Sequence, residues 1–426
     1  MGSFSSYSVH RHLLRHFRRF CTSPDASLTA LKSKLKAEHD PDKLLAIFSS
    51  AVDNLPTVSN RYALDITVKR LAKSRRFSDI ENLIESLKKS PKITQEAHAS
   101  SLIRAYASAG MVDHAVKMFE EMHVLGAPRS VVSFNAVLSA CNRSGKFEEV
   151  PKLFKELSEK YRIEPNEYSY GILIKALCES GAPEAAVNVL EEMREKKVQV
   201  TSFTYTSLLD AFYEKGKVHE AGKIWDEMGK KGCVRDVTAY NVKVKNASGG
   251  KPEGVLKLMD EMIEAGLKPD TISYNYLMTS YCKNHQMEEA MKVYETLPLN
   301  GCSANAATYR VLLFFLCRHK DYDKGLEVFQ ASVKADKIPD FGTLKLLVEG
   351  LAMDSEPEEA KKVIGVVKKK FPEGFMKAWK KLEAKLGLNK KAKDTEAKLG
   401  LNEAKDADAK LGLNEGEHTE PVATAT

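Results

Sequence analysis

The apolar residues of this chain recur with the period of an amphipathic helix, and they do so in pairs of short segments. In the segment that opens at Thr271, they follow the i, i+3, i+4, i+7 spacing of one helix face. This first stripe consists of Tyr274, Leu277, Met278 and Tyr281, and the next consists of Ala290, Val293, Tyr294 and Leu297. Neither helix can bury its stripe alone, so the pattern predicts helical hairpins that stack on one another.

The hairpin pattern is an internal repeat with a period of about 35 residues. Each copy opens with an aromatic residue followed at once by a residue that is polar in most copies. The aromatic residues that recur at this period are Phe134, Tyr170, Tyr205, Tyr240, Tyr274 and Tyr309. Counting outward from them predicts seven units, at 96–130, 131–166, 167–201, 202–236, 237–270, 271–305 and 306–340.

Less regular segments extend the array on both sides. We predict degenerate N-terminal helical repeats over 25–95, and a degenerate repeat with a C-terminal capping helix over 341–389. The fold class is therefore all-α, a solenoid of about nine to ten stacked hairpins. The symmetry of the sequence does not choose the hand of this superhelix.

The N-terminal segment, 1–22, differs in composition from the array. It contains Arg11, Arg15, Arg18 and Arg19, several serines and no acidic residue, with Leu13, Leu14 and Phe17 on one helical face. This pattern is typical of a transit peptide and predicts import into the mitochondrial matrix. The alternative is a basic tail that is retained and binds nucleic acid. No apolar run approaches the length of a membrane span, so we expect no membrane partner.

Charge and cysteine content narrow the possible functions. The four arginines of the N-terminal segment account for four of the net +7 charges, so the remaining chain is only mildly basic. RNA binding would then depend on local clusters of cations. The seven cysteines form no CxxC pair with zinc-ligand spacing, and no catalytic or metal-binding motif is present. We expect no metal, no cofactor and no enzymatic activity.

A low-complexity segment follows the array, over residues 390–426 and the residues just before it. The motif EAKLGLN occurs at 383–389 and 396–402, and a third copy with one substitution ends at Asn414. The equivalent leucines do not share a helix face, because the intervals between Leu386, Leu399 and Leu411 are not whole numbers of helix turns. We predict a disordered tail, with a segment that folds on a partner as the alternative.

The period and the motifs GLKPDTISYNYLM and SGAPEAAVNVLEEM resemble those of the pentatricopeptide repeat family. The resemblance implies a right-handed solenoid that binds single-stranded RNA, with one base read per repeat. It assigns base reading to the polar residue after the aromatic and to the last residue of the same repeat. The pairs are Asn135 with Asn166, Thr206 with Asp236, Asn241 with Asp270, and Asn275 with Asn305.

The resemblance also assigns specificities and supporting contacts. Thr206 with Asp236 resembles a guanine reader, Asn241 with Asp270 a uracil reader, and the other two pairs pyrimidine readers. Base sandwiching falls to the side chains three residues before each reader, Val132, Phe203 and Ile272. Arg143, Lys283 and Arg318 share one repeat position and are predicted to contact phosphates.

Other repeats depart from this pattern, which weakens the predicted code. Gly171 has no side chain to read a base, Arg310 is too long, Asp65 and Lys345 are off pattern, and the Ser100 assignment stays open. We therefore predict a non-catalytic RNA-binding protein of mitochondria, resembling ribosome-associated members of the family and acting in translation. Its partners would be single-stranded RNA or rRNA and mitochondrial ribosomal proteins. Alternatives are a factor for maturation or stability of one transcript, and a protein scaffold.

Overall fold

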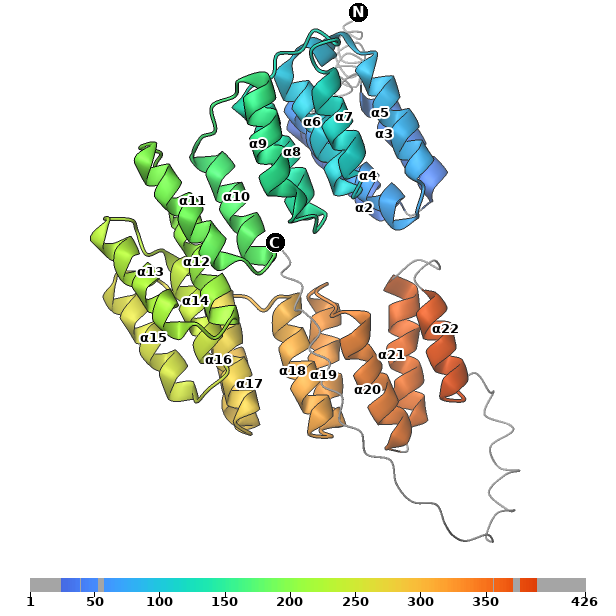
Figure 1. Cartoon of the computed structure of the whole chain (residues 1–426). Coiled ribbons are helices and arrows are strands. Elements are labelled where there is room, and N and C mark those ends of the chain that lie inside the picture. Colours follow the sequence, from blue (N-terminus) through green and yellow to red (C-terminus); the bar gives the residue numbers. More distant parts are fainter. Residues whose placement is uncertain (1–23, 39, 53–56, 355, 371–375, 389–426) are drawn as a thin grey trace, which may run out of the picture. The chain divides into compact units, whose positions relative to one another are not determined.

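The structure is a computed structural model that describes residues 24–38, 40–52, 57–354, 356–370 and 376–388. Within these residues every regular element is helical, and the helices follow one another as ten pairs and a last helix (Figure 1). The prediction of an all-α fold built from stacked helical hairpins is therefore confirmed. The predicted transit peptide and the predicted low-complexity tail lie outside the described residues.

The helix pairs begin with two N-terminal pairs, α2 (Pro24–Ala37) with α3 (Pro41–Val52) and α4 (Thr57–Lys73) with α5 (Phe77–Lys88). A short 3-10 turn, η1 (Pro91–Thr94), precedes the next pair. Seven pairs follow: α6 (Glu96–Ser108) and α7 (Val112–Glu121), α8 (Val131–Arg143) and α9 (Glu149–Tyr161), α10 (Glu167–Glu179) and α11 (Pro183–Glu195), α12 (Ser202–Glu214) and α13 (Val218–Lys230), α14 (Val237–Ala247) and α15 (Pro252–Glu264), α16 (Thr271–Lys283) and α17 (Met287–Thr296), α18 (Ala306–Arg318) and α19 (Tyr322–Lys334).

The chain ends its described part with α20 (Phe341–Met353), α21 (Pro357–Lys370) and α22 (Met376–Lys385). The chain divides into two compact units, and the boundary between them lies within α20, after Gly350. In the second unit, α22 buries Trp379 and Leu382, and the Lys368 ammonium lies 2.6 Å from a Glu383 carboxylate oxygen. This ion pair joins α21 to the helix that the sequence predicted as a cap.

The first helices of successive pairs pack on one another in the larger unit and form one layer. Thus α8 contacts both α6 and α10, and the same holds along α12, α14, α16 and α18. The second helices pack on their own first helix, and several, such as α7 and α9, also contact the first helix of the next pair. We call these the first-helix layer and the second-helix layer.

Small residues permit the two helices of a pair to approach closely. The small residues of the second helices lie buried; in α19 a Cβ added to Gly325 would lie 4.0 Å from Leu313 of its own first helix, α18, and 3.1 Å from Leu347 of the next first helix, α20. The buried small residues of the second helices are Ala115, Ala186, Ala221, Ala290 and Gly325. The opening aromatics pack beside them; the Phe154 ring, for example, lies 5.7 Å from Phe134 and 5.3 Å from Tyr170. The core thus runs along the array between the two layers.

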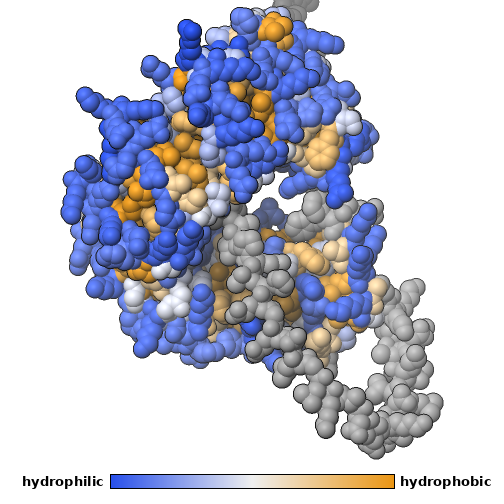
Figure 2. Space-filling model, in the orientation of Figure 1, coloured by the Kyte–Doolittle hydropathy of each residue, from blue (hydrophilic) through white to orange (hydrophobic). Residues whose placement is uncertain are grey.

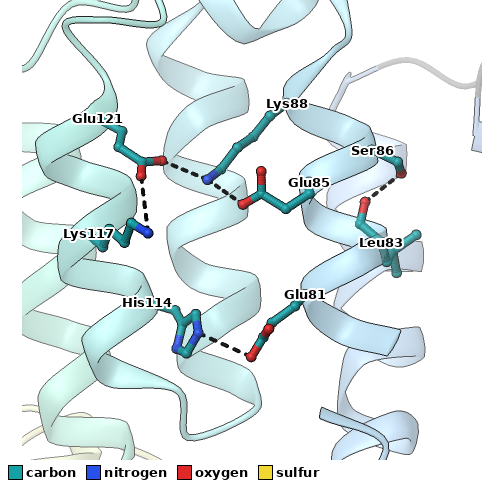
Figure 3. Close-up of polar contacts among 8 residues, drawn as sticks. All are labelled: Glu81, Leu83, Glu85, Ser86, Lys88, His114, Lys117 and Glu121. Atoms are coloured by element: carbon teal, nitrogen blue, oxygen red, sulfur yellow. Dashed lines mark hydrogen bonds and ion pairs between the residues drawn. The ribbon is translucent and has the colours of Figure 1, made fainter. Parts of the chain in front are cut away.

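The second-helix layer carries ion pairs between neighbouring repeats. The Lys88 ammonium of α5 lies 2.7 Å from Glu85 and 2.7 Å from Glu121 of α7, and His114 lies 3.2 Å from Glu81 (Figure 3). These carboxylates raise the pKa of Lys88 despite its burial. Hydrophilic residues cover most of the face seen in Figure 2, with apolar side chains visible between helices. No described helix is both long and apolar enough to cross a membrane.

Candidate nucleic-acid interface

The last residue of each predicted unit caps the first helix of the next unit. Asn166 has an extended backbone, and its side-chain oxygen accepts a hydrogen bond from the backbone N–H of Ser169 at 3.1 Å. The Ser169 hydroxyl in turn accepts from the backbone N–H of Asn166 at 3.1 Å, which completes a capping box. This local chemistry explains why the unit ends in a short polar residue and why each first helix begins where it does.

The predicted reader Asn135 is held by this cap of the following repeat. Its Nδ2 donates to Asn166 Oδ1 at 3.2 Å, and its Oδ1 accepts from the Ser169 hydroxyl at 2.6 Å. Both ends of the amide are therefore fixed, and one Nδ2–H remains for a further acceptor. The structure brings together the two predicted residues of this pair and adds Ser169, which the sequence did not single out.

Two further repeats build the same network. Asn241 donates to Asp270 at 3.1 Å and accepts from the Ser273 hydroxyl at 2.6 Å. Asn275, the next reader, donates to Asn305 at 3.3 Å and accepts from the Thr308 hydroxyl at 2.7 Å. Because the bonds are the same in all three repeats, the three amides present equivalent donors. A sequence signal for this network exists, since a Ser or Thr precedes the aromatic residue in each following repeat.

The predicted guanine pair is built differently. Thr206 donates its hydroxyl to the backbone carbonyl of Ser202 at 2.7 Å and makes no hydrogen bond to Asp236. Asp236 caps α14 through the Ala239 N–H at 2.9 Å and accepts from the Ser202 hydroxyl at 3.1 Å. In the three networks above, a Ser or Thr of the following repeat supplies the orienting hydroxyl. Here that position is Ala239, so the repeat after Thr206 offers no hydroxyl to orient a reader.

The blank repeat is filled by a neighbour. A Cβ on Gly171 would lie 3.4 Å from the ring of Phe203, which belongs to the next repeat. The aromatic ring therefore lies where a reader side chain would otherwise stand. The Lys175 ammonium lies 5.9 Å from the centre of the same ring.

Apolar side chains stand exposed beside the readers. Val132, Phe203 and Ile272 expose 50%, 51% and 47% of their surface, whereas Phe134 and Tyr205, two residues after the first two, are buried. Tyr168 occupies the same repeat position and is 67% exposed. Tyr168 was not among the predicted sandwiching residues, but its position in the repeat identifies it as a member of the same row.

The repeat at 96–130 replaces the reader by a carboxylate. Ser100 is fully buried and its hydroxyl has no hydrogen-bond partner among the described residues, so it does not face a ligand. Glu96 instead accepts from the backbone N–H and the hydroxyl of Ser130 and from the hydroxyl of Ser133, each at 2.8 Å. Burial would raise the pKa of Glu96, but these hydrogen bonds lower it overall.

The predicted phosphate contacts are exposed cations without a carboxylate partner among the described residues: Arg143, Lys283 and Arg318. Between them the Lys245 ammonium is paired, because it lies 2.9 Å from Asp210 and 2.8 Å from Glu214. Unpaired cations therefore do not run continuously along the first-helix layer from Arg143 to Arg318. The described residues hold no group of His, Cys, Asp or Glu arranged to bind a metal. Burial raises the pKa of Cys178, Cys282 and Cys317 to about 12.

Two family models match the repeats of this chain. The family model described as "PPR repeat family" matches residues 129–179, 172–214, 205–246 and 269–318, and the model described as "PPR repeat" matches 98–126, 246–267 and 307–334.

Two curated relatives from Arabidopsis thaliana cover nearly the whole chain. The small ribosomal subunit protein mL103 (rPPR7) is 50% identical over 89% of this chain and 95% of that protein. A pentatricopeptide repeat-containing protein named as mitochondrial is 51% identical over 89% and 93%. Among solved structures, maize PPR10 matches at 18% identity and a TM-score of 0.42 over 87% of this chain and 60% of that one. The curated relatives confirm the predicted mitochondrial location.

Proposed function

Because this chain belongs to the pentatricopeptide repeat family, we propose that it is a non-catalytic, RNA-binding component of the small subunit of the mitochondrial ribosome. The observation that carries the proposal is the 50% identity with mL103 over 95% of that protein's length. The relationship covers 89% of this chain and so includes most of the array, which supports extending the proposal to the array as a whole.

The first-helix layer supplies chemistry suited to single-stranded RNA. A base that enters between the exposed side chains of two successive repeats would stack on Val132, Tyr168, Phe203 or Ile272. The remaining Nδ2–H of Asn135, Asn241 or Asn275 then meets the base edge, where it can donate to a carbonyl oxygen such as that of a pyrimidine. The capping residue fixes the direction of this donor, so little side-chain entropy is lost on binding.

The limited number of such repeats favours a ribosomal role over selection of one transcript. Three repeats hold an oriented amide, one has Thr206 and one has Gly171. At about 1 to 3 kcal/mol for each discriminated base, these positions give weak selectivity among many transcripts. On a ribosome, neighbouring proteins and rRNA structure supply the remaining specificity, and the array needs only to hold one strand in register.

A second candidate function is that of a factor for one mitochondrial transcript. It is favoured by one observation: the reader networks of Asn135, Asn241 and Asn275 are equivalent and intact. A surface used only as a scaffold would not require amides oriented in this way.

Gradient sedimentation of the tagged chain from a mitochondrial extract separates these functions. At low magnesium, where the ribosomal subunits part, the chain should move with the small subunit. Treatment with RNase under conditions that leave subunits intact should not release it. A chain that stays near the top of the gradient, or that moves in small RNase-sensitive particles, would contradict the ribosomal role.

A further inference from the structure

Three arginines from three consecutive repeats meet at one cavity of the first-helix layer. Arg61 lies on α4, Arg104 on α6 and Arg143 on α8, and all three line a cavity of about 310 Å³. The same cavity is lined by Asn135 and Val132, a predicted base reader and a predicted sandwiching residue. Each arginine belongs to a different repeat, so only the stacking of the repeats brings them together.

In the part of the chain that the structure describes, ion pairs do not balance the charges of this cluster. Among the described residues, none of the three guanidinium groups forms an ion pair, and the buried Nε of Arg104 has no hydrogen-bond partner. Burial raises the pKa of Asp65, one turn from Arg61 on α4, while the Ser108 hydroxyl at 2.6 Å, the Lys69 ammonium at 2.9 Å and the charge of Arg143 lower it overall. Asp65 thus lies near the cluster, but it is bonded to Ser108 and Lys69 and not to an arginine. Burial, followed by the charges of Arg61 and Arg143, lowers the pKa of Arg104. An arrangement of like charges that costs stability is typical of a binding site.

We propose that the cavity between α4, α6 and α8 binds a phosphate group of the RNA backbone through Arg61, Arg104 and Arg143. Guanidinium groups present paired N–H donors that fit phosphate oxygens, and three of them can surround one phosphodiester. RNA is favoured over an acidic protein because Asn135 and Val132 open into the same cavity. A nucleotide whose base lies at Asn135 would therefore place a neighbouring phosphate among the arginines. This inference rests on the proposed RNA binding.

The site would anchor the strand at the start of the readable repeats. A phosphate contact adds affinity without sequence preference, whereas the amides add preference with little affinity. The three arginines would thus set which nucleotide enters the first reader, and the amides of the following repeats would read from that point.

The test uses the full chain and a single-stranded oligouridine RNA long enough to span all the repeats. Affinity is measured over a series of KCl concentrations for the unmodified chain and for the double variant Arg61→Gln/Arg143→Gln, which changes two exposed side chains. We expect the variant to bind roughly tenfold more weakly and its dependence of log K on log salt to be shallower by about 1. The control Lys117→Gln/Lys152→Gln removes the same charge from exposed positions of α7 and α9 and should change neither value.

Arg104→Gln distinguishes a binding role from a structural one. Without RNA, its melting temperature should equal or exceed that of the unmodified chain, because a buried, repelled charge is removed. Its oligouridine affinity should nevertheless fall. A lower melting temperature with an unchanged salt dependence would overturn the inference.

The remaining outcomes are also decisive. If the double variant and its control behave alike, the cavity does not hold an RNA phosphate. The inference also fails if inorganic phosphate binds the cavity while the salt dependence of RNA binding is unchanged, because the ligand is then a free anion. If the unmodified chain binds no oligouridine, the proposed RNA binding itself is wrong.

Discussion

Two stretches of the first-helix layer carry cations at the same repeat position but differ in what surrounds them. Arg104 of α6 and Lys245 of α14 are each the ninth residue of their repeat. Arg104 lies with two other arginines and no paired carboxylate, whereas Lys245 is held between Asp210 and Glu214 of α12. An unpaired cation can attract a phosphate, while a paired one is already neutralised, so of these two stretches the α6–α8 stretch is the one suited to bind the RNA backbone.

The largest effect is expected from a substitution in α13, the second helix that packs on the α12–α14 stretch. Ala221 is fully buried on α13, where it packs beside α12. Ala221→Leu should overpack this pair and reduce the free energy of unfolding by about 1 to 3 kcal/mol. Lys223→Leu, two positions further on and exposed, is the control and should have little effect. Urea titration measures both, and equal losses would mean that the helix crossing is assigned wrongly.

Base reading can be rebuilt in the same stretch. Thr206→Asn introduces the amide. Ala239→Ser adds a hydroxyl in the following repeat, at the position from which Ser273 orients Asn241 and Ser169 orients Asn135. The double variant should shift preference from guanine toward uracil at that register by roughly 1 to 3 kcal/mol, since the new amide can bond Asp236 as Asn241 bonds Asp270.

The single variants serve as the controls for this experiment. Thr206→Asn alone should shift the preference less, because nothing then fixes the direction of the amide. Ala239→Ser alone should leave the preference unchanged. Affinities for RNAs with guanine or uracil at that position, measured at one salt concentration, decide the matter. A shift of equal size with and without Ala239→Ser would show that the hydroxyl does not orient the reader.

Freeing Lys245 should make the α12–α14 stretch resemble the α6–α8 stretch. Asp210→Asn/Glu214→Gln removes both carboxylates from the ammonium. Oligouridine should then bind more tightly at low salt, with a salt dependence steeper by about 1. Asp113→Asn/Glu156→Gln removes the same charge from the second-helix layer and is the control. If both double variants strengthen binding equally, the effect comes from net charge and the local pairing is irrelevant.

The smallest effect concerns Glu96, the carboxylate beside the α6–α8 stretch. Its hydrogen bonds from Ser130 and Ser133 lower its pKa in the folded chain. The ionised Glu96 carboxylate therefore contributes to the free energy of unfolding above the ordinary carboxyl pKa of about 4.5, and this contribution is lost as the pH falls through the lower pKa of the folded chain. Glu96→Gln should cost on the order of 1 kcal/mol at neutral pH. Its difference from the unmodified chain should shrink in denaturant titrations as the pH is lowered below that range; a constant difference would contradict this assignment.

The sequence predicted the hairpins because each depends on local signals. The apolar spacing, the closing residue that caps the next helix and the small residue at Ala221 all act within one repeat or at its boundary. The pairs of Asn135, Asn241 and Asn275 with their capping residues followed from the family pattern, and the structure joins each by a hydrogen bond.

What the sequence did not reveal depends on contacts between repeats. Lys245 is neutralised by carboxylates of the preceding repeat, and Phe203 fills the space above Gly171 from the following one. Arg61 and Arg104 gain significance only beside Arg143, which requires three repeats to be stacked in register. A one-dimensional charge count treats all of these cations alike, because pairing is set by packing.

The most direct test of RNA binding along the first-helix layer is ultraviolet crosslinking of the chain in intact mitochondria, followed by mass spectrometry of nucleotide-linked peptides. We predict adducts on α10 and α12, at Tyr168 and Phe203, whose exposed rings stand in the row that flanks the readers. The linked nucleotides should map to RNA of the small ribosomal subunit. Adducts confined to the second-helix layer, or to α21 and α22, would contradict the account.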